Sequence, residues 1–176
     1  MKHTLSVLVE NKPGVLTRVS GLFARRGFNI DSLVVAETEN PELSRMTITV
    51  DEQDQPVEQV TKQLHKLINV IKITSLDPAE SIERELLLIK VKANAESRSE
   101  IMQMVEIFRA KIVDVSAEVL IIEMTGTREK VSAFMELLEQ FGVVELVRTG
   151  RLAMGRGKRP TLSSAGFGRR CCVTVP

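Results

Sequence analysis

Aromatic side chains are scarce in this sequence of 176 residues: they make up 3% of it, and tryptophan and tyrosine are absent. Proteins that bind single-stranded nucleic acid by base stacking need aromatic faces, so the composition argues against that class. Cysteine is also scarce, and its two copies are the neighbours Cys171 and Cys172. Without a CxxC pattern or a histidine cluster, this pair predicts neither a disulfide framework nor a zinc site.

Long hydrophobic runs are missing as well. The longest aliphatic runs, Leu86–Ile89 and Val119–Ile122, fall far below the ~20 residues that a membrane span requires. The first residues lead straight into an alternating pattern, without the apolar stretch of a secretory signal. With 43% hydrophobic and 27% charged residues, the chain has the composition of a globular protein, and we expect it to be cytoplasmic.

Acidic residues are absent from the C-terminal end, where seven basic residues follow Val147. Residues 1–147 carry 17 basic and 23 acidic residues, so a basic segment follows an acidic body. Such a segment can bind nucleic acid or an acidic partner. Residues 151–176 are also rich in glycine and lack periodicity, which favours a disordered, solvated tail.

The first half of the chain predicts the element order βαββαβ. Alternation over residues 4–9 indicates a strand, and apolar residues at helical spacing follow from Val15 to Phe23. Pro13 occupies the place of a proline at the first helical position, and Gly27 that of a C-terminal glycine cap. Two strands are predicted at residues 29–37 and 43–50. A second helix is predicted from Asp54-Gln55-Pro56 onward, and a last strand at residues 70–76.

The second half repeats this order after a predicted linker at residues 78–82. A strand around Ile89 leads into a helix over residues 101–108, followed by two strands. Thr127 is expected to cap the second helix, which ends at Gly142 before the last strand. The sequence therefore predicts an α+β protein with two tandem ferredoxin-like domains, residues 1–77 and 83–150. Because each has only ~70–75 residues and one uncovered sheet face, we expect pairing between chains or between the halves.

Catalytic candidates are nearly absent. The two histidines, His3 and His65, belong to no nucleophile or metal motif, and Gly155–Lys158 lacks the spacing of a phosphate-binding loop. We therefore expect a protein that is not an enzyme. The one unusual segment runs from Glu10 to Leu16, where a predicted helix N-terminus offers free N–H groups to a carboxylate. Gly14 there lets a ligand approach the backbone, although a capped helix without ligand fits these residues equally well.

Residues 11–16, Asn-Lys-Pro-Gly-Val-Leu, resemble the signature of ACT domains, which are amino-acid-sensing modules of metabolic enzymes. Longer stretches resemble the regulatory small subunit of acetohydroxyacid synthase (acetolactate synthase). The resemblance covers residues 2 to about 157 and ends after Gly157. The stretches that carry it are residues 5–11, 21–33, 43–48, 62–67, 84–91 and 148–151.

The resemblance implies a non-catalytic subunit of branched-chain amino acid biosynthesis. Such a subunit activates a large catalytic subunit, which carries thiamine diphosphate, Mg²⁺ and FAD, and makes it sensitive to feedback inhibition by valine. This chain is then expected to bind no cofactor or metal and to form a homodimer through its ACT domains, with valine, or leucine or isoleucine, between them. The implied effector-binding residues are Asn11, Pro13, Gly14, Val15 and Leu16 of one chain, with Asn29 and Ile30 of the paired chain.

Three alternatives remain open at this point, of which a small enzyme is the least expected, because the sequence offers no candidate nucleophile, base or metal site. A stand-alone ACT sensor of another pathway would not need the second half. A nucleic-acid-binding ferredoxin-like protein would need the basic tail and aromatic residues on its sheet.

Overall fold

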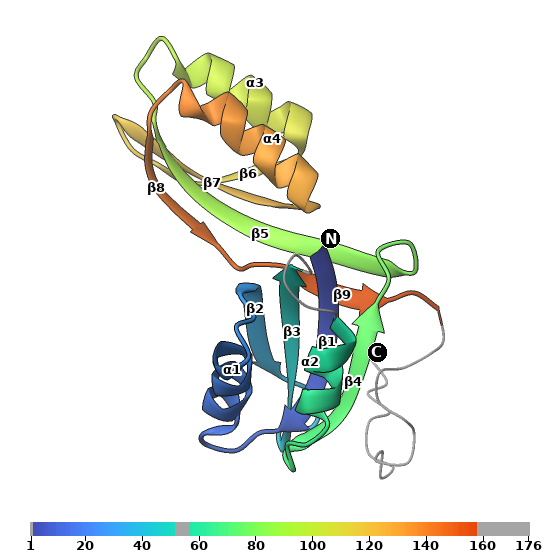
Figure 1. Ribbon diagram of the computed structural model, residues 1–176. Helices are drawn as coiled ribbons and strands as arrows, with labels where there is room; N and C mark the ends of the chain where they lie inside the picture. Colours follow the sequence, from blue (N-terminus) through green and yellow to red (C-terminus); the bar gives the residue numbers. More distant parts are fainter. Residues whose placement is uncertain (1, 52–56, 158–176) are drawn as a thin grey trace, which may run out of the picture.

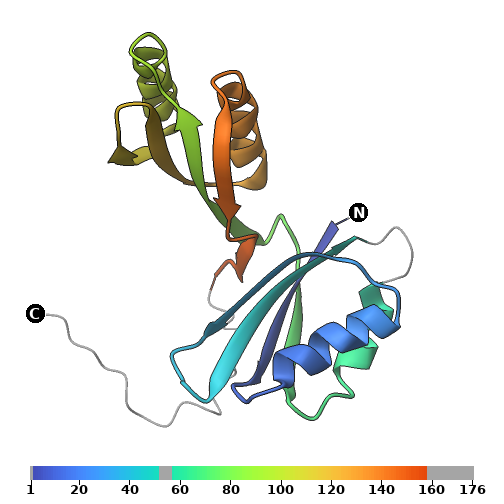
Figure 2. The same cartoon turned by 90° about the vertical axis from the view of Figure 1, so that its left-hand side faces the viewer.

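The computed structural model describes residues 2–51 and 57–157 of the chain. Residues 2–76 form an antiparallel sheet in the order β2-β3-β1-β4, with both helices on one face (Figures 1 and 2). The elements are β1 (Lys2–Glu10), α1 (Val15–Arg25), β2 (Ile30–Glu37), β3 (Leu43–Asp51), α2 (Val57–Leu64) and β4 (Val70–Leu76).

A second unit of the same design follows, with the strand order β6-β7-β5-β8 and two helices on one face (Figure 1). Its elements are β5 (Ser81–Lys92), α3 (Arg98–Phe108), β6 (Lys111–Val115), β7 (Val119–Gly126), α4 (Arg128–Glu139) and β8 (Val143–Arg148). The α+β class and the tandem ferredoxin-like architecture are thus confirmed.

Each unit has its own hydrophobic core. Phe23 is fully buried in the first core, among inward-facing residues of β1 and β3 such as Val7 and Ile48. Phe134 is fully buried in the second, beside Ile89 of β5 and residues of β7. The two cores share no residue, so the packing that stabilises one unit is separate from that of the other.

The predicted signals for helix starts and ends are confirmed, with one exception. Thr127 caps α4 by accepting a hydrogen bond from the Lys130 N–H at 3.4 Å, and Gly27 and Gly142 follow helices with φ of 72° and 87°. Pro13, however, lies outside α1, which begins only at Val15. The reason is Gly14, whose φ of 81° cannot belong to a right-handed helix.

The structure differs from the sequence prediction where the two units join. Ser81, placed in the linker, begins β5, and β9 (Leu152–Gly155) lies inside the expected tail. β9 pairs antiparallel with the first residues of β5, and such pairing between residues 68 to 74 positions apart has no local sequence signal. Cys171 and Cys172, the rest of the expected tail from residue 158, and the expected helix start at residues 54–56 lie outside the described residues.

The units contact each other through residues near β9. The Arg151 guanidinium forms an ion pair with Glu83 at 3.0 Å, and Glu83 also accepts a hydrogen bond from the Thr4 hydroxyl of β1 at 3.1 Å. The backbone N–H of Arg151 donates a hydrogen bond to Ser32 Oγ of β2 at 2.9 Å. Gly150 precedes it with φ of 84°, and a Cβ there would collide with Ser32 Oγ.

Candidate functional site

The junction between β1 and α1 leaves a helix N-terminus open. Gly14 is the N-cap of α1, with φ 81° and ψ −6°, and no side chain caps the helix. A Cβ at Gly14 would meet no atom within 4 Å, so the space beside it is empty. The first N–H groups of a helix lack intrahelical partners and carry the positive end of the dipole. This arrangement can accept a carboxylate.

Charged side chains surround this helix start. Glu10 accepts hydrogen bonds from Asn69 Nδ2 at 2.5 Å and Lys12 Nζ at 3.1 Å, and Arg18 donates to Asn69 Oδ1 at 2.8 Å. The bond from Asn69, and then that from Lys12, hold the pKa of the Glu10 carboxyl below its usual value. A zwitterionic ligand could meet here an anion for its ammonium group and two cations for its carboxylate.

Sequence reasoning missed the role of Asn69, because this residue lies 59 positions beyond Glu10. Its neighbour in the chain, Val70, opens β4, which pairs with β1. The only feature near Gly14 in the sequence that indicated a charged site was the pair of cations on either side of it, Lys12 and Arg18.

Asn11 also has a structural role within the first domain. Its Nδ2 donates to the Pro41 carbonyl at 2.8 Å and to Glu37 Oε1 at 3.2 Å, while its N–H donates to the Glu42 carbonyl at 2.7 Å. These bonds hold the β2–β3 turn against the end of β1. Both amide hydrogens therefore have partners, and the side-chain oxygen is the atom of Asn11 that remains for a ligand.

The other residues of the motif differ in exposure. The Val15 side chain belongs to the first core and is 4% exposed, so within one chain its backbone is the part open to a ligand. Pro13 is exposed, and Leu16 is 44% exposed. Leu16 is thus an apolar side chain that one chain leaves uncovered.

Asn29 and Ile30 lie at the opposite end of α1 from Gly14. The 11 residues of the helix separate them by about 16 Å. A single chain therefore does not bring together all the residues predicted to bind the effector. β2, which Ile30 opens, is an edge strand of the first sheet, and a second chain could approach along that edge.

Within the described ranges, no group of three or more His, Cys, Asp or Glu side chains could hold a metal ion. None of the helices in this part of the chain is both long and apolar enough to cross a membrane.

Comparison with known proteins places the chain in a family. Residues 5–72 match the model of the AHAS small subunit-like ACT domain, and residues 84–157 match that of the small subunit of acetolactate synthase. A probable acetolactate synthase small subunit from Archaeoglobus fulgidus is 59% identical over 159 residues, which cover 90% of this chain and 99% of that protein. The chain belongs to the acetolactate synthase small-subunit family.

Other members agree with this assignment. The acetolactate synthase small subunit of Mycolicibacterium smegmatis is 57% identical over 157 residues, covering 89% of this chain and 92% of that one. The crystal structure of the acetolactate synthase small subunit from Thermotoga maritima superposes with a TM-score of 0.84 at 52% identity, covering 90% of this chain and 99% of that chain. The resemblance noted in the sequence is confirmed: this is a small regulatory subunit of acetolactate synthase with an ACT domain.

Proposed function

We propose that this small subunit activates the large catalytic subunit of acetolactate synthase in the cytoplasm and makes it sensitive to feedback inhibition by valine. The large subunit carries the thiamine diphosphate, Mg²⁺ and FAD, and this chain contributes no cofactor. Valine binds between the ACT domains of two paired chains. The observation that carries the proposal is the uncapped start of α1 beside Gly14, within a chain of this family.

The chemistry of valine fits the β1–α1 junction. Its carboxylate accepts hydrogen bonds from the backbone N–H groups that follow Gly14. Its ammonium group lies against the side-chain oxygens of Glu10 and Asn11. Its isopropyl group packs on the exposed Leu16, and Asn29 and Ile30 of the paired chain close the site. A pocket of this kind separates side chains that differ by one methylene by only ~1–3 kcal/mol, so leucine and isoleucine are the natural competitors.

The position of β2 supports pairing between chains. β2 is an edge strand, and its unpaired side offers backbone N–H and C=O groups to a second copy. Val35 of this strand is 38% exposed. Two β2 strands side by side bring the start of each strand, with Ile30, towards the other chain, where a ligand at Gly14 can be shared.

A route from this site to the second domain runs along β2. Ile30 opens the strand, and a register irregularity separates it from Ser32. The Ser32 hydroxyl accepts the hydrogen bond from the Arg151 N–H. An effector that shifts the start of β2 therefore acts directly on the contact between the domains. Coupling of this kind needs two arrangements with different affinities for valine.

The test compares two matched glycine variants. Gly14→Asp places a carboxylate where that of valine should lie, so valine binding should be lost. Gly157→Asp is the control, because Gly157 has a similar φ of 78°, equally open surroundings and a position far along the chain. Valine at ~100 times its Kd should add ~2.7 kcal/mol of stability, or about 5–10 °C in Tm, to the wild type and to Gly157→Asp, but not to Gly14→Asp.

Calorimetric or dye-based detection is required, because the chain has no tryptophan or tyrosine. Each variant is measured alone and with the large subunit, since the pocket could be complete only in the complex. A folded Gly14→Asp protein that binds valine as well as the wild type does, in either setting, overturns the placement of the site.

A truncated chain tests the division of labour between the domains. Residues 1–77 contain a complete hydrophobic core and the β2 edge, so they should form dimers and bind the large subunit. Inhibition by valine should require residues 83–150, because the proposed route ends in the second domain. Enzyme assays of the large subunit with either chain measure this, and full valine inhibition by residues 1–77 contradicts the division.

A further inference from the structure

The turn between α2 and β4 exposes an isoleucine almost completely. Ile68 is 96% exposed, more than any other large apolar side chain of the described residues. A single exposed apolar residue is common in proteins, so its meaning depends on whether the fold requires it and on what surrounds it.

Backbone hydrogen bonds identify the corresponding turn of the second domain. The Glu10 N–H donates to the Asn69 carbonyl at 2.9 Å, and the Lys92 N–H donates to the Gly142 carbonyl at 3.0 Å. Asn69 and Gly142 therefore occupy corresponding positions, directly before β4 and β8.

The turn of the first domain is one residue longer than that of the second. Four residues lie between Asn69 and Leu64, the last buried residue of α2. Three residues lie between Gly142 and Leu138, the last buried residue of α4.

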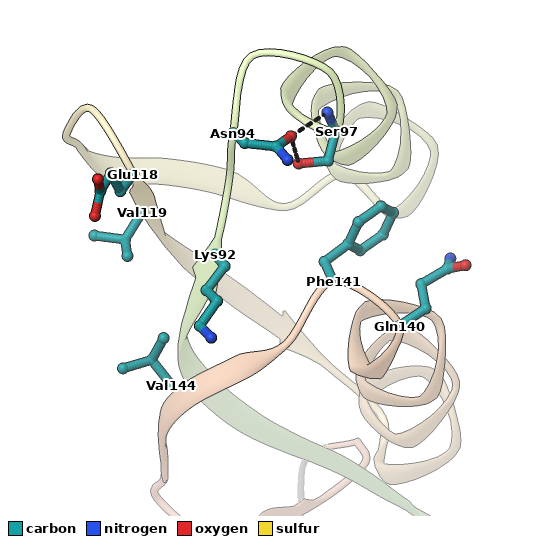
Figure 3. Close-up of a pocket in the computed structure, with 8 residues that line it drawn as sticks. All are labelled: Lys92, Asn94, Ser97, Glu118, Val119, Gln140, Phe141 and Val144. Atoms are coloured by element: carbon teal, nitrogen blue, oxygen red, sulfur yellow. Dashed lines mark hydrogen bonds between the residues drawn. The ribbon is translucent and has the colours of Figure 1, made fainter.

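Ile68 is the additional residue, because Leu67 before it takes the role of Phe141 in the second domain. Both of these side chains are partly buried and pack against the core of their own domain. Figure 3 shows the Phe141 ring directed towards α3. The fold thus closes this turn without a residue in the place of Ile68, which leaves the isoleucine for a contact outside the chain.

Basic side chains surround this isoleucine. The helices α1 and α2 lie side by side on one face of the first sheet (Figures 1 and 2). Arg18 and Arg25 are seven positions apart on one side of α1, and Lys62 and Lys66 are four positions apart at the end of α2. All four are exposed. We call these four cations and Ile68 the basic corner.

The cations of the basic corner have no carboxylate partner among the described residues. Arg25, Lys62 and Lys66 form no ion pair there. Arg18 donates to the amide oxygen of Asn69 at 2.8 Å. The fold does not dictate this charge, since α3 and α4 of the second domain carry five acidic and three basic residues.

Two carboxylates lie near the basic corner, and neither neutralises it. Glu58 is in the first turn of α2 and makes no ion pair with Lys62, one turn further on. Glu10 is already bonded to Asn69 and Lys12. The corner therefore presents uncompensated positive charge around an apolar side chain.

We propose that the basic corner is the surface by which this chain docks on the large catalytic subunit. Ile68 enters an apolar pocket of that subunit, and the cations face carboxylates around the pocket. This proposal rests on the proposed function, in which the chain binds a large subunit. A buried apolar anchor within a polar, charged rim is the usual anatomy of a protein interface.

A second copy of this chain does not suit the basic corner. In a twofold contact a patch meets itself, which would bring like charges together. The pairing of chains through β2 also leaves the corner free, because β2 and β4 are opposite edges of the first sheet. A nucleic acid would satisfy the cations, but its phosphates offer Ile68 no pocket.

The basic corner adjoins the effector site through one amide group. Asn69 accepts from Arg18 of the corner and donates to Glu10 beside Gly14. Docking of the large subunit and binding of valine would thus act on the same side chain.

The test measures binding of the full-length chain to the immobilised large subunit at low and high salt. Ile68→Ser should weaken binding by ~10-fold or more, mainly through faster dissociation. The double variant Lys62→Glu with Lys66→Glu should slow association by ~10-fold or more at low salt and reduce its salt dependence.

Matched controls come from the second domain. Ile107→Ser changes a 76% exposed isoleucine of α3, and Lys111→Glu reverses an exposed lysine of β6. Neither should change binding to the large subunit. A Tm equal to that of the wild type shows that each variant is folded.

The outcomes separate the docking surface from the proposed function. If the wild type does not bind the large subunit, the proposed function fails and the surface with it. If the wild type binds, and Ile68→Ser and the lysine variant bind equally well or the controls weaken binding as much, only the surface is overturned. A lysine variant that loses binding to a DNA duplex and keeps the large subunit would instead make the corner a nucleic-acid site.

Discussion

The two domains begin their first helices differently, although the preceding strand ends with the same backbone hydrogen bond, from Glu10 to the Asn69 carbonyl and from Lys92 to the Gly142 carbonyl. α1 starts at Gly14 without a side-chain cap. Before α3, Asn94 accepts from the Ser97 N–H, and Arg98 donates to three carbonyls, of which that of Ser116 is nearest at 2.7 Å. The N-cap of α3, Ser97, likewise makes no side-chain cap, so the two helix starts differ in the turn before the helix and not in capping. The left-handed Gly14 and the empty space beside it distinguish the start of α1, which supports a ligand-binding role there.

The largest effect is expected from substitutions in the cores, which test how far the domains are independent. Phe23→Ala and Phe134→Ala each remove a fully buried ring, at a cost of ~3–5 kcal/mol to the domain concerned. Because the cores share no residue, each variant should lose the structure of one domain and keep the methyl NMR spectrum of the other. Loss of both spectra in either variant shows that the domains unfold as one unit.

A smaller effect is expected at the contact between the domains. Gly150→Ala forces a side chain into φ 84° and against Ser32 Oγ, whereas Gly157→Ala meets nothing within 4 Å at φ 78°. Both carry the backbone strain of ~1–2 kcal/mol, but only the first disturbs the Ser32–Arg151 hydrogen bond. Thermal unfolding should place Gly150→Ala below Gly157→Ala, and enzyme assays should show weakened valine inhibition only in Gly150→Ala. Equal inhibition in the two variants contradicts the route along β2.

The helix starts should differ in their response to loss of an asparagine. Asn94→Ala removes the acceptor for the Ser97 N–H and should destabilise the second domain by ~1 kcal/mol. Asn11→Ala releases the β2–β3 turn without uncapping a helix, so it should lower valine affinity more than stability. Urea unfolding combined with valine titration measures both, and an equal stability loss without any change in valine affinity argues against Asn11 as an effector residue.

The smallest expected effect is a loss of stability at low pH, to which one carboxyl group of each domain contributes. Hydrogen bonds from Asn69 and Lys12 lower the pKa of Glu10 from 4.5, and the bond from its own N–H, followed by that from Thr127, lowers the pKa of Glu129. A lowered folded-state pKa gives stability that is present above pH 4.5 and is lost as the pH falls through the folded value. Below pH 4.5 the Tm of Glu10→Gln should fall less steeply than that of the wild type, because one of the two carboxyl groups is removed. An unchanged pH profile contradicts this role of Glu10.

The helix boundaries of this chain were largely predictable because their signals are local. Gly27, Gly142 and Thr127 each act through the conformation or the cap of the residue itself, and each ends or begins a helix as expected. Pro13 also looked like a local signal, but the left-handed Gly14 after it delays the helix until Val15.

Contacts between distant segments were not predictable in the same way. The bond between Asn69 and Glu10 and the pairing of β9 with β5 depend on how the strands meet, which composition and periodicity do not express. Asn69 and Gly142 occupy corresponding positions, because their carbonyls accept hydrogen bonds from the Glu10 and Lys92 backbone N–H groups, and the sequence pattern does not reveal this match.

β5 has a consequence for how the two domains are joined. Its residues Ser81–Arg84 pair with β9, and from Glu85 onward the same strand lies at the centre of the second sheet. Successive side chains of a strand point to opposite faces, so an inserted residue at Arg84 would turn Glu83 away from Arg151 while Glu85 kept Arg148. Joints between domains usually tolerate changes of length. Here the domains share one continuous strand, so the spacing of Glu83 and Glu85 along it determines which face each carboxylate occupies and thereby how one domain is oriented to the other.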